Sequence, residues 1–105
     1  MTDAQVEAQA KTKRRARQDA DDMRWLLSGQ RGRRIVYRQL EAAGVFRLSF
    51  NTNAMAMSFA EGARNVGLQM LARVMTVQPD AYALMVKENT DDNRNPDDAA
   101  AADEQ

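Results

Sequence analysis

The sequence contains no cysteine and no histidine. Without cysteine the chain has no disulfide framework, no thiol nucleophile and no zinc ribbon. Without histidine it lacks the usual general base and the commonest transition-metal ligand. No run of residues approaches the roughly 18 consecutive apolar positions that a membrane span requires, and the first residues lack the apolar core of a secretory signal. We therefore predict a soluble protein of a reducing compartment, or of a particle assembled in one, with no catalytic, cofactor or metal site and no membrane partner.

The charged residues are balanced in number but not in position. The 105 residues carry 15 Lys/Arg and 15 Asp/Glu, and this length suits one small domain. Residues 1–38 hold ten basic and five acidic side chains, residues 39–85 hold three of each, and residues 86–105 hold two basic and seven acidic ones. A basic front and an acidic end suggest charged interaction arms on a small core, or two ends that attract one another.

The residue pattern predicts an all-α fold, a small domain of three to four helices between two charged arms. Residues 1–20 form a basic polar arm, helical or frayed, because good helix formers dominate it but only Val6 could anchor it to a core. Residues 21–89 form the helical domain. Residues 90–105 are acidic and lack large hydrophobic side chains, so they are predicted to form a disordered tail.

Glycine, proline and capping residues mark the ends of the predicted helices. A first core helix begins near Asp21 and breaks at Gly29, a second covers about 30–43, a third covers about 54–77, and a fourth begins at Pro79. Gly44 follows the second helix, where a left-handed cap is favoured. Any of Asn51, Thr52 and Asn53 could cap the start of the third.

Aromatic residues are predicted to supply most of the mass of the core. The third helix carries a stripe in which apolar residues recur every three or four positions, namely Phe59, Ala63, Val66, Met70, Val74 and Val77. A loop is expected to insert Val45, Phe46 and Phe50. The predicted core is Trp25, Leu40, Phe46, Phe50, Phe59, Val66 and Leu71. Gly62 and Gly67 are expected to allow close helix packing, since glycine inside a helix otherwise costs roughly 1 kcal/mol relative to alanine.

Two basic clusters are candidate contacts for a partner or for phosphates. They comprise Lys11, Lys13, Arg14, Arg15 and Arg17 in the arm, and Arg31, Arg33, Arg34 and Arg38 in the second helix. Phosphate contact through such clusters is salt-sensitive and largely independent of sequence. Apart from Tyr37 they contain no aromatic residue for stacking on bases. A solvated face, or an arm that docks on an acidic partner, is the other interpretation.

Two further polar groupings have simple structural interpretations. The segment from Gly29 to Arg33 resembles a phosphate loop, but it lacks the lysine and hydroxyl and follows no strand, so we expect a helix break. Glu61 and Arg64 are three residues apart and can pair along the third helix. Glu61 and Asn65 are expected to tie that helix to a loop or a neighbouring helix, because Glu61 has no catalytic partner nearby.

The order of the distinctive residues resembles one protein family. The series is Trp25-Leu26-Leu27, Gly32-Arg33-Arg34, Leu40-Glu41-x-Ala43-Gly44-Val45-Phe46, Ser49-Phe50, Glu61-Gly62-x-Arg64-Asn65-Val66-Gly67-Leu68, Leu71, Pro79, Tyr82, Met85 and Glu88. It resembles a family of small proteins of tailed bacteriophages, named after an open reading frame of the Bordetella tropism-switching podophage. The resemblance covers about residues 22–89 and leaves both arms outside. Ala63 stands where the resemblance leads us to expect a larger polar residue.

The resemblance implies a non-enzymatic virion or morphogenesis protein and supplies no catalytic residue. The expected partners are phage structural proteins: a portal, a scaffold, a tail adaptor or an internal core protein. The expected location is the host cytoplasm during assembly, or the virion itself. Self-association is a further expectation, because a small domain can gain stability from a second copy. The alternative is a nucleic-acid-associated packaging or regulatory protein that contacts DNA through the basic arm and the arginines of the second helix.

Overall fold

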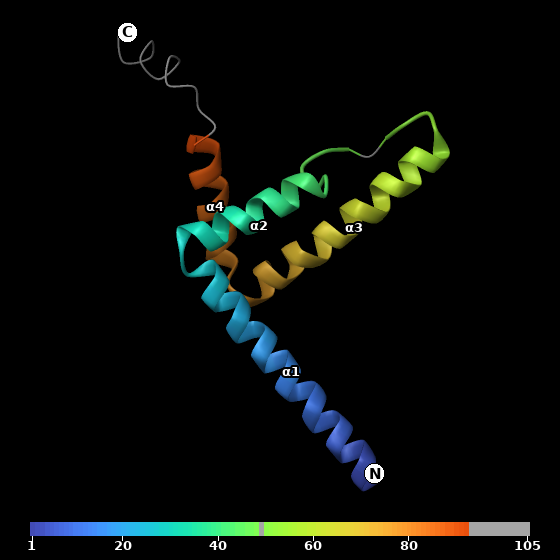
Figure 1. The fold of residues 1–105 in the computed structure, drawn as a ribbon, viewed down its shortest axis with the longest axis vertical. Coiled ribbons are helices and arrows are strands. Elements are labelled where there is room, and N and C mark those ends of the chain that lie inside the picture. Colours follow the sequence, from blue (N-terminus) through green and yellow to red (C-terminus); the bar gives the residue numbers. More distant parts are fainter. Residues whose placement is uncertain (49, 93–105) are drawn as a thin grey trace.

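The computed structural model describes residues 1–48 and 50–92. Within them the chain forms four helices and no strand, which confirms the all-α prediction: α1 (Asp3–Leu27), α2 (Gln30–Ala42), α3 (Ala54–Val77) and α4 (Pro79–Asp92). None of these described helices is long and apolar enough to cross a membrane. The arrangement is flat and open, with extents of 71 × 40 × 16 Å (Figure 1). The last turn of α4 includes residues 90–92, which the sequence assigned to the tail, and the rest of the predicted tail lies outside the described residues.

Helix α1 is one continuous helix that joins the predicted arm to the predicted first core helix. Thr2 begins it with a capping box, in which the backbone N–H of Gln5 donates to the Thr2 hydroxyl at 3.2 Å and the Gln5 side chain accepts from the Thr2 N–H at 2.8 Å. Asp21 therefore lies inside a helix, and the predicted start there is wrong. Only Met23 and Leu27 of α1 are buried, so most of this helix projects from the other three (Figure 1).

Helices α1 and α2 meet at a sharp corner, which confirms the predicted helix break. Ser28 closes α1, its N–H donating to the carbonyl of Trp25 at 3.2 Å, and Gly29 precedes α2. A Cβ on Gly32 would lie 1.7 Å from the backbone oxygen of Leu26. Glycine at this position therefore allows the first turn of α2 to lie directly on the end of α1.

The turn after α2 and the start of α3 both follow the sequence prediction. Gly44 has a φ of 82°, and its N–H and that of Val45 donate to carbonyls of the last turn of α2 at 3.0 and 3.1 Å. This pair of bonds is a Schellman motif, for which a left-handed glycine is favoured. Asn53 caps α3, because its side chain accepts from the N–H of Ala56 at 3.0 Å.

The buried core draws on all four helices and is aliphatic. Its hydrophobic members are Met23, Leu27, Val36, Leu40, Val74, Ala81 and Met85. Tyr37, Tyr82 and Leu71 pack against it while partly exposed. Gly67 confirms the prediction of close packing, since a Cβ there would lie 2.5 Å from Cγ2 of Val45.

The prediction that aromatic side chains fill the core is mostly wrong. Trp25, Phe50 and Phe59 are exposed, and so is the predicted core residue Val66. Phe46 is partly covered, because its ring stacks on that of Tyr37 with centroids 5.2 Å apart, but it does not enter the core either.

The difference in length between α2 and α3 explains why the start of α3 is exposed. Helix α3 has 24 residues and α2 has 13, or about 36 and 20 Å at 1.5 Å per residue. The buried positions of α3, Gly67 and Val74, lie in its second half. Its first half extends away from the core, and Gly62, predicted to permit close packing, has nothing within 4 Å of a Cβ placed on it.

Candidate interaction surfaces

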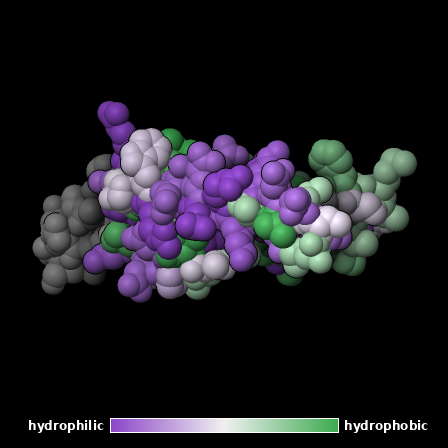
Figure 2. Space-filling view, turned by 90° about the horizontal axis from the view of Figure 1, so that it is seen from below, coloured by the Kyte–Doolittle hydropathy of each residue, from purple (hydrophilic) through white to green (hydrophobic). Residues whose placement is uncertain are grey.

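One end of the molecule exposes large apolar side chains. Leu48 and Phe50 belong to the α2–α3 loop, Met55 and Phe59 belong to the first half of α3, and Val66 lies at the middle of that helix. Their exposed fractions run from 65% at Val66 to 92% at Leu48. Figure 2 shows hydrophobic residues gathered at this end, whereas hydrophilic residues cover the middle of the view. Such a gathering, unlike scattered exposed apolar residues, is typical of a contact surface, and we call these five residues the apolar end.

A groove of about 360 Å³ runs between the end of α2 and the first half of α3. Small side chains of α3, those of Ala56, Ala60 and Ala63, line it together with Phe50 and Phe59 of the apolar end. Ala63 is the position where the family resemblance predicted a larger polar residue. The alanine leaves apolar space beside the two aromatic rings.

A second exposed apolar patch lies at the α1–α2 corner. Trp25 is 77% exposed, and Ile35 is also exposed. Both line a shallow hollow of about 460 Å³ together with Leu26, Arg31 and Gly32. The predicted core role of Trp25 is wrong because α1 turns Met23 and Leu27 toward the core, and Trp25, between them in sequence, points to solvent. We call Trp25 and Ile35 the corner patch.

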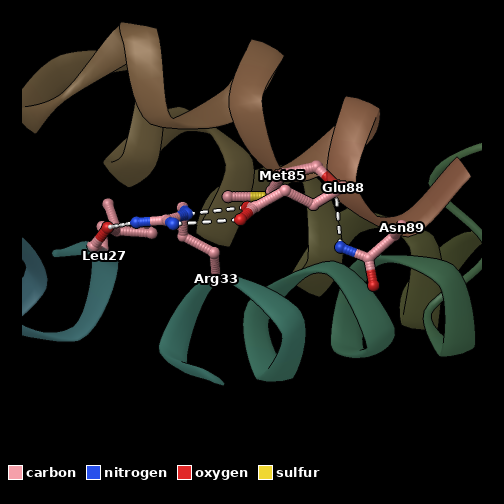
Figure 3. Close-up of polar contacts among 5 residues, drawn as sticks. All are labelled: Leu27, Arg33, Met85, Glu88 and Asn89. Atoms are coloured by element: carbon pink, nitrogen blue, oxygen red, sulfur yellow. Dashed lines mark hydrogen bonds and ion pairs between the residues drawn. The ribbon is translucent and has the colours of Figure 1, made fainter. Parts of the chain in front are cut away.

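Arg33, predicted to contact a partner, forms an internal ion pair instead. Its Nε and Nη2 donate to the two carboxylate oxygens of Glu88 at 2.7 and 3.0 Å, and its Nη1 donates to the carbonyl of Leu27 at 3.0 Å (Figure 3). The two charged side chains are only 13% and 15% exposed. Beside them Asn89 is buried and donates to the carbonyl of Met85 at 2.7 Å. Arg33 thus joins α2 to α4 and to the last turn of α1.

The ion pair shifts the pKa of both partners so that each charged form is favoured. The hydrogen bonds from Arg33 hold the pKa of Glu88 below its ordinary value of 4.5; partial burial acts in the opposite direction, and the charges of Arg33 and Arg34 lower the pKa further. In turn, the hydrogen bonds to Glu88 raise the pKa of Arg33. Because each charge stabilises the other, the pair is a structural tie between helices.

The other basic candidates lie in two separate places. Lys11, Lys13, Arg14, Arg15 and Arg17 are exposed on the projecting part of α1, but they spread around the helix, since successive residues turn by about 100°. Arg31, Arg34 and Arg38 share one face of α2. None of these eight side chains has an ion-pair partner in the part of the chain that the structure describes. Because α1 and α2 diverge from the corner (Figure 1), the two clusters do not form one surface.

The polar residues of the first half of α3 do not make the predicted contacts. Glu61 and Arg64 form no ion pair, and neither Glu61 nor Asn65 makes a side-chain hydrogen bond, within residues 1–48 and 50–92. The Nε of Arg64 is buried and has no hydrogen-bond partner among the same residues. Helix α3 is instead tied to α1 by Arg73, which donates to both carboxylate oxygens of Asp19.

The comparison with protein families confirms the family resemblance that the order of distinctive residues predicted. The family described as Bbp19-like phage protein matches residues 23–87. The chain belongs to this family. A search of curated proteins and a search of solved structures found no match.

The matched segment of the phage family covers most of the parts of the fold that pack together, although Glu88 and Asn89 lie just beyond its end. It runs from Met23, the first buried residue, to within five residues of the end of α4. It contains the whole apolar end and the corner patch, whereas the basic cluster of α1 lies outside it.

In the described part of the chain, no group of three or more acidic side chains lies close enough together to hold a metal ion.

Proposed function

We propose that this member of the phage family is a non-enzymatic structural or morphogenesis protein. It acts through protein–protein contacts at the head, portal or internal core of the particle. The apolar end carries the proposal, because five large apolar side chains lie exposed within the segment that the family shares. Burial of apolar surface contributes roughly 25 cal/mol per Å², so a partner that covers this end gains a large and salt-insensitive contribution to binding.

The proposed partners are a portal, a scaffold, a tail adaptor or an internal core protein of the particle. Such proteins are present in many copies, and repeated weak contacts on a symmetric ring then add up through multivalency. The proposed location is the host cytoplasm during assembly, followed by the virion if the chain is retained there.

Substitution of Phe50 tests the proposal, because this ring lines the groove but belongs to the loop and supports no helix. In the phage that encodes the chain, Phe50→Asp is expected to lower its copy number in particles and assembly intermediates at least tenfold relative to the major capsid protein. Mass spectrometry of purified particles gives this ratio. Ala83→Asp, which introduces the same charged residue on the exposed side of α4, is the control and should leave the ratio unchanged. An unchanged ratio for Phe50→Asp, or no association with particles at any stage, contradicts the proposal.

The alternative is a nucleic-acid-associated packaging or regulatory role. The eight basic side chains that have no ion-pair partner among the described residues favour it; all of them are exposed except Arg34, which is partly covered. Binding to duplex DNA would then fall steeply with added salt, because each neutralised phosphate releases a counterion. Combined replacement of Arg31, Arg34 and Arg38 by glutamine would reduce the slope of that salt dependence. If purified chain binds no DNA at low salt, the alternative fails and the protein-contact role stands.

A further inference from the structure

Four residues form one exposed stripe from the start of α3 to its middle. Met55, Phe59, Gly62 and Val66 are separated by four, three and four positions, a spacing that places them on one side of a helix. The three large side chains are exposed, and a Cβ on Gly62 would meet nothing within 4 Å. We call these four residues the α3 stripe. Its three large side chains belong to the apolar end, and the stripe is about 17 Å long at 1.5 Å per residue.

The α3 stripe is free of charge. The charged residues of the first half of α3 are Glu61 and Arg64. At about 100° per residue both lie more than about 120° away from the middle of the stripe. A second helix can therefore cover the stripe without removing a charged group from water, which would otherwise oppose binding.

No contact within residues 1–48 and 50–92 accounts for Gly62. Glycine inside a helix costs roughly 1 kcal/mol relative to alanine. At Gly67 the close contact with Val45 accounts for the glycine, but Gly62 faces open space. A glycine between Phe59 and Val66 leaves a hollow in the apolar stripe, and such a hollow admits one large side chain from an opposing helix.

The spacing of the α3 stripe is the same in both directions along the helix. In an antiparallel pair of α3 helices with a two-fold axis between residues 60 and 61, Phe59 faces the partner subunit's Gly62, and Met55 faces the partner subunit's Val66. The same contacts occur twice, as an isologous interface requires. In a parallel pair, by contrast, phenylalanine opposes phenylalanine and the two hollows remain empty.

We propose that the α3 stripe binds the same stripe of a second copy of this chain, antiparallel, with each Phe59 ring seated over the partner subunit's Gly62. Three turns of helix bury less surface than the roughly 800 Å² per partner of a standard interface, so the dimer depends on protein concentration. The inference goes beyond the proposed function and concerns the purified chain alone: the dimer covers the α3 stripe and leaves Leu48 and Phe50 of the apolar end open to a particle partner. The particle assay with Phe50→Asp and the dimer assays below can therefore fail independently.

Cross-linking tests the register directly, because the natural chain contains no cysteine. Met55→Cys and Val66→Cys chains are purified separately, mixed in equal amounts and oxidised, and mass spectrometry separates the three disulfide products. A disulfide requires Cα atoms within about 7 Å. The antiparallel register therefore predicts the mixed product, since identical positions lie 11 residues apart, about 17 Å along the axis. Products of identical chains alone, or no disulfide, overturn the proposal.

Sedimentation equilibrium tests whether the Phe59 ring packs over Gly62 of the partner subunit. Gly62→Leu fills the hollow and is expected to raise the dimer dissociation constant at least tenfold in sedimentation equilibrium over a wide concentration range. Ala72→Leu adds the same side chain at an exposed position of α3 about 120° from the stripe and should leave the constant unchanged. Circular dichroism confirms that both variants are folded. A natural chain that stays monomeric, or a Gly62→Leu chain that dimerises as well as the natural one, contradicts the proposal.

Discussion

The guanidinium of Arg33 holds the carboxylate of Glu88 with two hydrogen bonds of 2.7 and 3.0 Å, across 55 positions of sequence. Its remaining nitrogen donates to the carbonyl of Leu27, so a single side chain ties α2 to α4 and to the end of α1. Because both charged groups are largely covered, removal of one leaves the other without a partner in a poorly solvated place. A small aliphatic core therefore depends on this ion pair for the relative positions of three helices.

Glu88→Gln is expected to lower the free energy of unfolding by about 2 kcal/mol, the range typical of hydrogen bonds to charged groups. Urea denaturation followed by circular dichroism measures the difference. Asp19→Asn is the matched control, because it breaks the ion pair with Arg73, whose side chains are close to half exposed. Exposed pairs contribute at most about 1 kcal/mol. Equal losses in the two variants would show that Glu88 has no special structural role.

The stability of the fold is expected to fall in acid because of Glu88. Its pKa is lower in the folded chain than in the unfolded one, so below neutral pH the unfolded state binds more protons. The contribution is complete above the unfolded value, near 4.5, and is lost as the pH falls through the lower folded value. Urea midpoints from pH 7 downward should therefore converge for the natural chain and Glu88→Gln below about pH 4.5. A difference that stays constant with pH would contradict this assignment.

Local signals explain why the helix ends were predictable from the sequence. Gly44, Asn53 and Pro79 act on backbone groups within a few residues of themselves, so their effects do not depend on the rest of the fold. The start of α1 was not predictable in the same way. Asp21 has the composition of a first turn, but the good helix formers before it extend the helix to Asp3.

The exposed stripe of α3 shows why much of the predicted core was wrong, although Leu40 is buried as predicted and Leu71 packs against the core. A periodicity of three and four residues predicts an apolar helix face, but it does not state whether the same chain or another covers that face. Val74 belongs to the part of α3 that the chain itself covers, whereas Phe59 and Val66 belong to the face that it leaves open. The role of Arg33 was missed for a related reason: its partner is distant in sequence, although the family resemblance had included both Arg33 and Glu88.

Gly32→Ala is expected to destabilise the fold by about 3 kcal/mol or more, because the new Cβ would overlap the backbone of Leu26 and α2 would have to move. Gly62→Ala is the control. Its Cβ meets nothing, so the helix should gain up to about 1 kcal/mol in dilute, monomeric protein. Urea denaturation of both variants shows whether the free energy of unfolding falls for Gly32→Ala and rises for Gly62→Ala. A harmless Gly32→Ala would mean that the α1–α2 corner is not as close as the structure shows.

The projecting part of α1 is expected to add little to the stability of the helical core. Residues 3–16 contain no buried side chain, whereas Met23 is almost completely buried. Removal of residues 2–16 should therefore reduce the helical circular dichroism signal but change the free energy of unfolding by less than about 1 kcal/mol, which allows for the loss of the Thr2 cap. Met23→Ala in the full chain should cost about 3 kcal/mol, since it removes buried methylene groups and leaves a cavity. If the truncated chain is as unstable as Met23→Ala, the basic helix packs on the core and cannot serve as a free arm.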